Sequence, residues 1–270
     1  MRDLKKLAVF SLAIASPELI VPDMLASLPQ VTTNTLTYPQ LQWRLEGFQP
    51  SSVRGAISGL KAEGAVTTLQ REGKTHIRLT TVGRELLFSF IQPGVFRRRR
   101  WDEQWRIAIF SGVALSAEAE QRYRVLRRFL AKRGFAQLER GVYISPYPLG
   151  EDEVKVLSRN KALGLLTILE GKRFVLGDER EWCRQAWNLD QIGKEYTKIS
   201  NQCMRAITQL KSENGLNQTH KAQFRLYTNQ LLQMLVGDPG LPFSLLPEEF
   251  SFESCLKNYI SLSIQIKNRD

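Results

Sequence analysis

Apolar side chains recur at helical spacing at three places in the first third of the chain. The positions that define these three stripes are Leu4, Leu7, Phe10 and Ile14; Leu41, Leu45 and Phe48; and Val53, Ile57 and Leu60. The second stripe predicts a helix with Pro39 in its first turn. The third predicts a helix with Ser51 or Ser52 as its N-cap, running to about Ala62 and stopping near Gly64.

After the third stripe the pattern changes to that of strands. Residues 66–70 and 75–80 are rich in residues that favour strands, and a polar four-residue turn separates them. Ile77 and Leu79 lie on one side of the second run, as alternation requires. Two helices joined by a tight connection and followed by a hairpin predict a winged helix-turn-helix domain over residues 1–96.

The first stripe has a second interpretation. Basic residues precede the apolar run 7–15, and Ala13 and Ala15 have the small-x-small spacing of a secretory signal. The run is short, Asp3 dilutes the basic region, and one face is apolar at helical spacing. We therefore expect a buried first helix, with a signal peptide as the alternative.

The middle of the chain alternates between strand-like and helical patterns. Gly134 has the position of a C′ residue that ends a strong helix. The predicted elements are a strand at 105–111, a helix capped by Ser116 and running through Arg133, strands on either side of Arg140 and Gly141 between 135 and 144, a helix from Glu151 and a strand at 165–170. Strand, helix, strand, strand, helix, strand is the order of a ferredoxin-like domain, which we assign to residues 97–177.

Residues 178–270 carry a longer helical pattern. Its apolar seam alternates spacings of three and four, at Leu189, Ile192, Tyr196, Ile199, Cys203, Ala206 and Leu210. A second helix is predicted at about 218–235. The seam fits an antiparallel helical hairpin within one chain or a dimer interface. The predicted fold class is thus α+β: a winged helix-turn-helix, a ferredoxin-like βαββαβ domain and a C-terminal helical domain.

Charge indicates the kind of partner. The 270 residues carry a net charge of +11, and the first hundred hold 14 Lys and Arg against 7 Asp and Glu. An excess of positive charge in a winged helix predicts binding to double-stranded DNA. The residues expected to contact DNA are Ser51, Ser52, Arg54, Ser58 and Lys61 on the recognition helix, and Arg71, Lys74 and Arg78 on the wing. The run Arg97, Arg98, Arg99 and Arg100 fits a solvated linker or further phosphate contacts.

Few residues in the sequence are candidates for catalysis or for binding a metal or cofactor. The three cysteines are far apart and show no C-x-x-C spacing, which favours a reduced, cytoplasmic protein. The chain has only two histidines, and we expect His76 to be an exposed wing side chain. No glycine-rich phosphate loop or nucleophile–base pair is present. We therefore expect no catalytic residues, cofactor or metal site, and no membrane segment.

The stretch 105–146 resembles the small ferredoxin-like nuclease subunit of CRISPR spacer acquisition. The resemblance rests on the basic helix, Gly134 and the segment QLERGVY at 137–143. That family places a metal-binding Asp at the end of its first strand, where this chain has Ser111. A metal-dependent nuclease is therefore the alternative function, and the missing acid argues against it.

Co-linear segments over most of the chain resemble the PaaX family of phenylacetate-degradation repressors more fully. They are SVRGAISGL at 52–60, IRLT at 77–80, WDEQW at 101–105, GVYISP at 141–146, WNLD at 187–190, DPGLP at 238–242 and LLP at 245–247. Gly59 departs from the pattern, because family members usually carry Arg there. The resemblance implies a repressor, a homodimer, an inverted-repeat operator and release by an acyl-CoA effector, phenylacetyl-CoA in the best-known members.

Overall fold

The computed structural model describes residues 2–20, 34–91, 95, 101–111, 117–159, 164–172, 174, 176–213 and 215–269. The chain forms two compact units. One comprises Met1–Arg97, Gln191–Asp238 and Glu249–Asp270, and the other comprises Arg98–Asp190 and Pro239–Glu248. These units are defined by contacts and group the ends of the chain together, so the boundaries predicted at 96 and 177 stay predictions.

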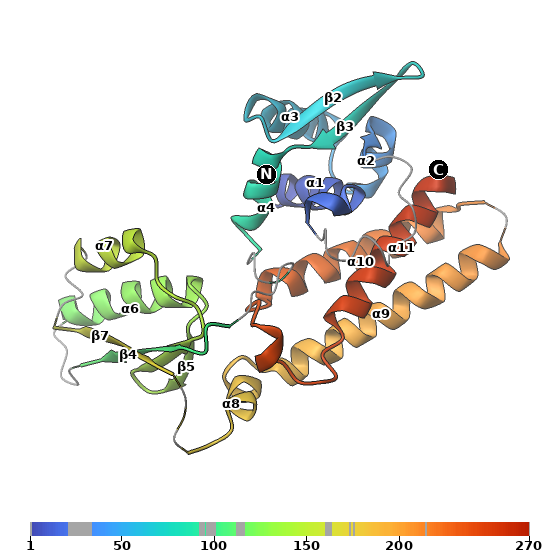
Figure 1. Cartoon of the computed structure of the whole chain (residues 1–270). Helices are drawn as coiled ribbons and strands as arrows, with labels where there is room; N and C mark the ends of the chain where they lie inside the picture. Colours follow the sequence, from blue (N-terminus) through green and yellow to red (C-terminus); the bar gives the residue numbers. More distant parts are fainter. Residues whose placement is uncertain are drawn as a thin grey trace. The chain divides into compact units, whose positions relative to one another are not determined.

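The first unit begins with the predicted winged helix (Figure 1). Its elements are α1 (Arg2–Ala15), the 3-10 helix η1 (Pro17–Leu19), β1 (Leu36–Thr37), α2 (Tyr38–Arg44), α3 (Pro50–Ala62), β2 (Val66–Arg71), β3 (Lys74–Leu79) and α4 (Thr81–Phe88). The three strands form an antiparallel sheet in the order β1-β3-β2. Glu72 and Gly73 join β2 to β3 with positive φ angles of 51° and 71°, as a type I′ hairpin turn requires.

Helix α1 is a core element, as the buried-helix interpretation predicts. Ala8, Val9, Phe10 and Ala13 are fully buried, and the helix contacts α3, α4, α10 and α11. The sequence also allows a short helix over Leu19–Leu28, and residues 21–33 lie outside the described part of the chain.

The same unit contains the long C-terminal helices α9 (Leu189–Ser212), α10 (Gln218–Gly237) and α11 (Phe252–Arg269). From Tyr196 to Leu210 the predicted seam is buried in one core with α1, α2, α10 and α11. The interpretation of the seam as packing within one chain is therefore confirmed, and its use as a dimer interface is wrong. The reason is that α10 and α11 already cover it.

The second unit contains the ferredoxin-like domain. Its elements are β4 (Trp105–Phe110), α6 (Ala117–Lys132), β5 (Ala136–Glu139), β6 (Val142–Ser145), α7 (Glu151–Arg159), β7 (Leu166–Gly171), α8 (Glu179–Ala186) and the 3-10 helix η3 (Phe243–Leu245). The sheet has the order β5-β6-β4-β7 with antiparallel neighbours, which confirms the predicted topology. Side chains of α6 and α7 pack on one face of this sheet through a small core that includes Leu126, Leu130 and Leu157.

None of the helices in the described ranges is both long and apolar enough to cross a bilayer.

Candidate nucleic-acid interface

Helix α3 is oriented by its apolar stripe. Val53, Ala56, Ile57 and Leu60 are buried, which leaves the opposite face to solvent. The prediction that a serine caps this helix is wrong: the N-cap is Gln49, whose side chain makes no capping hydrogen bond. Proline lacks an N–H and has a φ angle suited to the first turn, so the helix begins at Pro50.

The predicted contact residues of α3 share this solvent-facing side. Ser51, Ser52, Arg54, Ser58 and Lys61 are all exposed. Lys61 Nζ donates a hydrogen bond to Thr68 Oγ1 on β2 at 3.0 Å. Helix α3 is thus joined to the hairpin at its C-terminal end, while Arg54 and the serines face solvent.

Helix α1 supplies a basic residue that the sequence did not predict here. Lys5 Nζ is 2.5 Å from Glu63 Oε1, just past the end of α3. A Cβ atom on Gly59 would lie 3.7 Å from Lys5 Nζ. The ion pair of Lys5 and Glu63 therefore lies beside Gly59 on α3. No local signal in the sequence links Lys5 to α3.

The wing brings further basic residues to the same domain. Arg71 and Lys74 are exposed and lie opposite each other in the strand register, next to the turn at the tip of the hairpin. The hairpin extends beyond α3 (Figure 1). Arg78 is half-buried on β3. The expectation that His76 is exposed is wrong, because β1 covers it: it is half-buried, and its Nδ1 is 3.0 Å from Thr35 Oγ1. Residues Arg97–Arg100 lie outside the described part of the chain.

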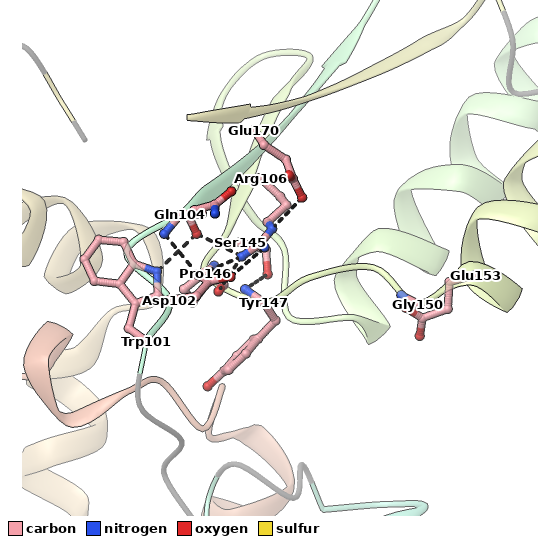
Figure 2. Close-up of polar contacts among 10 residues, drawn as sticks. All are labelled: Trp101, Asp102, Gln104, Arg106, Ser145, Pro146, Tyr147, Gly150, Glu153 and Glu170. Atoms are coloured by element: carbon pink, nitrogen blue, oxygen red, sulfur yellow. Dashed lines mark hydrogen bonds and ion pairs between the residues drawn. The ribbon is translucent and has the colours of Figure 1, made fainter. Parts of the chain in front are cut away.

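The central domain carries a polar cluster around a buried arginine (Figure 2). Arg106, at the start of β4, is 5% exposed. Its Nη1 and Nη2 atoms donate to the two carboxylate oxygens of Asp102 at 3.0 and 2.7 Å, and its Nε donates to Glu170 Oε1 at 3.0 Å. The carbonyl oxygens of Gln104 and Pro146 also accept from Nη1.

This cluster explains the segment WDEQW. Asp102 holds Arg106, while Trp101 packs edge-on against Trp105 with ring centroids 5.0 Å apart. Hydrogen bonds from Arg106 hold the pKa of Asp102 below its usual value. Burial alone would lower the pKa of Arg106, but its hydrogen bonds to Asp102 and Glu170 raise it. Both groups are therefore charged at neutral pH, and their arrangement fixes the entry to β4.

The residues weighed for catalysis in the sequence have these positions in the structure. Ser111 follows β4 and is exposed, and no cluster of three His, Cys, Asp or Glu in the described ranges could hold a metal. Burial raises the pKa of Cys183 and Cys203 to about 12, so these thiols stay protonated and unreactive at neutral pH.

Two family models match the chain. One, described as the PaaX protein central Cas2-like domain, matches residues 98–183. The other, described as the PaaX-like protein C-terminal domain, matches residues 187–268, so that together they cover more than half of the chain. The chain belongs to the PaaX family. The two PaaX matches span the ferredoxin-like domain and the C-terminal helices, and these are domains of a PaaX-type regulator.

A solved structure shares this PaaX fold. The uncharacterized protein Rv0674 from Mycobacterium tuberculosis is similar with a TM-score of 0.53 and 16% sequence identity, over 93% of this chain and 97% of that chain. At this identity the likeness concerns the fold alone. No sequence among the curated proteins matches the chain.

Proposed function

We propose that this PaaX-family regulator is a DNA-binding transcriptional repressor that inserts α3 into the major groove of its operator. The observation that carries the proposal is the solvent-facing side of α3, where Arg54, Ser58 and Lys61 are exposed together beside a basic hairpin. A helix of this kind fits the major groove, where an Arg side chain forms bidentate hydrogen bonds with a guanine base. The wing residues Arg71 and Lys74 then contact phosphates.

The proposed repressor is a cytoplasmic homodimer on an inverted-repeat operator. One winged helix makes a small interface, and a second copy multiplies sequence specificity. Half-sites would lie about one or two helical turns apart, in multiples of roughly 10 bp. An aryl-CoA effector then releases the DNA by favouring a conformation in which the two recognition helices no longer match this spacing.

Selection from a pool of random duplex DNA tests the proposal. The full chain should enrich one inverted-repeat sequence and bind it at least about 10³-fold more tightly than unrelated DNA of the same length. Light scattering should give the mass of a dimer at micromolar concentration. A pool with no enriched sequence after several rounds contradicts the repressor assignment, and a monomer that binds a single half-site tightly contradicts the dimer.

The effector is tested on the selected DNA. Phenylacetyl-CoA should lower the affinity of the dimer for this DNA while the mass from light scattering stays that of a dimer, because the effector changes spacing and not subunit contacts. Free CoA is the control. Release by free CoA alone, or dissociation to monomers, is inconsistent with this mechanism.

We also propose that the chain is not an enzyme. Ser111 supplies no carboxylate for a metal at the end of β4. Incubation with DNA or RNA and Mg²⁺ or Mn²⁺ should give no cleavage above a buffer control. Metal-dependent cleavage that a substitution in the central domain abolishes would favour the nuclease alternative instead.

A further inference from the structure

A groove of about 360 Å³ lies in the ferredoxin-like domain, on the face of the sheet that the helices cover. Its apolar lining comes from Leu149 just before α7, from Val154 and Leu157 on α7, and from Leu166 and Ile168 on β7. Its polar lining residues are Arg106, Glu170 and Ser158, whose hydroxyl donates to the carbonyl oxygen of Val154. Its volume falls in the range of small-molecule sites, and such sites combine an apolar wall with a few polar groups that fix orientation.

Arg106 contributes a hydrogen-bond donor on this side. A guanidinium group is planar and has five N–H donors in fixed directions, and one N–H of Nη2 points the same way as the Nε–H. Here the Nε–H points to Glu170 on β7, and Nη2 gives its other hydrogen to Asp102. Within the described ranges no residue accepts the remaining N–H of Nη2, and the planarity of the group directs this N–H alongside the Nε–H, toward β7.

Glu170 contributes an acceptor beside this donor. Its Oε1 accepts from Arg106 Nε at 3.0 Å, and its side chain is 57% exposed, so a carboxylate, which can accept about four hydrogen bonds, keeps acceptor capacity for a ligand. A donor from Arg106 and an acceptor from Glu170 therefore stand side by side next to an apolar wall. A carboxamide presents the complementary pair, a C=O that accepts and an N–H that donates.

We propose that this groove binds a small apolar carboxamide, with the hydrocarbon part against α7 and β7 and the amide on Arg106 and Glu170. An ester offers only the acceptor, so it loses the hydrogen bond to Glu170. A carboxylate offers no donor and brings a negative charge next to Glu170, which disfavours it further. The proposal concerns the central domain and does not depend on the winged helix binding DNA.

Binding of three matched compounds to the full chain, followed by calorimetry or ligand-observed NMR, tests this assignment. Hydrocinnamamide should bind about 3–10-fold more tightly than methyl hydrocinnamate, because one additional hydrogen bond contributes about this much to affinity. Hydrocinnamate should bind most weakly of the three. Equal affinity for all three compounds, preference for the ester or acid, or no saturable binding of hydrocinnamamide overturns the proposal.

Two variants locate the site. Leu157→Trp should fill the groove and remove hydrocinnamamide binding, and a melting curve checks that the variant still folds, because Leu157 also belongs to the small core of this domain. Glu170→Gln removes the negative charge, so it should reduce the discrimination against hydrocinnamate, whereas Glu139→Gln, on the exposed end of β5, should leave it unchanged. If Leu157→Trp does not fold, the Glu170→Gln comparison decides. Unchanged selectivity in Glu170→Gln contradicts the assignment.

Discussion

At the scale of single residues, close packing decides which amino acid fits at a position. Gly83, near the start of α4, is buried because the helix approaches the end of α3 and the sheet at this point. A Cβ atom at this position would lie 2.2 Å from the carbonyl oxygen of Ala65 and 2.5 Å from Leu79 Cδ1. Thr80 caps the same helix by accepting from the backbone N–H of Gly83. Only glycine fits here without movement of the backbone.

Gly83→Ala is therefore expected to lower the free energy of unfolding by about 1–3 kcal/mol, the usual cost of overpacking. Gly55→Ala is the matched control, since a Cβ atom there meets nothing within 4 Å and alanine favours helix by roughly 0.5–1 kcal/mol. Urea unfolding of both variants measures the difference. A Gly83→Ala variant as stable as Gly55→Ala would show that α4 does not lie so close to Ala65.

The pair of Asp102 and Arg106 predicts a dependence of stability on pH. Hydrogen bonds from Arg106 lower the pKa of Asp102 below its ordinary value of 3.8. A carboxyl with a lowered folded-state pKa stabilises the fold above the ordinary value, and this contribution is lost as the pH falls through the folded-state pKa. Below pH 3.8 the melting temperature of the wild type should therefore fall further than that of Asp102→Asn. Parallel losses in the two proteins would contradict the pairing.

Elements that are defined by local patterns were predictable from the sequence. The stripe of α3, the alternation in β3 and the order of elements in the central domain depend on neighbours within a few positions. The predicted N-cap of α3 was wrong because Pro50, rather than Ser51, occupies the first position of the helix. Strand β1 has two residues and no pattern, and it was not predicted, although it is what covers His76.

The candidate site was predictable to the same extent. Arg54, Ser58 and Lys61 follow from helical spacing alone, and the structure places them on one exposed face. Lys5 contacts Glu63, which is 58 positions away in the sequence, and Arg106 contacts Glu170, which is 64 positions away. No local spacing reveals either contact. Asp102 and Arg106 are four residues apart, a signal that was available in the sequence.

Helix α3 and the wing should differ in what they contribute to the proposed DNA binding. Arg71→Ala with Lys74→Ala in the wing is expected to weaken binding to specific and random DNA by the same factor. It should also reduce the slope of log affinity against log salt by about 0.9 for each phosphate that the variant no longer neutralises. Titrations at several salt concentrations measure the slope. Weaker binding confined to the specific sequence would instead assign the wing to base recognition.

At the scale of the whole molecule, the winged helix and the C-terminal helices share a core. Helix α2 is attached to α10 and α11 through Arg44, which is 6% exposed, donates to Ser263 Oγ at 3.3 Å and lies over the ring of Phe224. Arg225 on α10 pairs with Glu46 just after α2 and donates to the carbonyl oxygen of Trp43. The elements proposed to bind DNA are therefore not structurally independent of the C-terminal helices.

A fragment of residues 1–97 should consequently fail to unfold cooperatively, because α1 and α2 lose the apolar partners that α10 and α11 provide. Circular dichroism during heating compares the fragment with the full chain, in which these elements should melt together. A sharp transition of the fragment near that of the full chain would mean that the winged helix is stable alone and that the shared core contributes little.

The recognition face of α3 is tested most directly by the operator affinity of Arg54→Ala combined with Lys61→Ala. A base-reading Arg contributes about 1–3 kcal/mol, so the double variant should lose at least about tenfold in affinity for the selected DNA. It should also bind that DNA with less preference over random sequence. The control is Arg205→Ala with Lys211→Ala, which removes the same charge from exposed positions of α9 and should leave the affinity nearly unchanged. A folded Arg54→Ala/Lys61→Ala protein that binds the operator as the wild type does would contradict the assignment of α3 as the recognition helix.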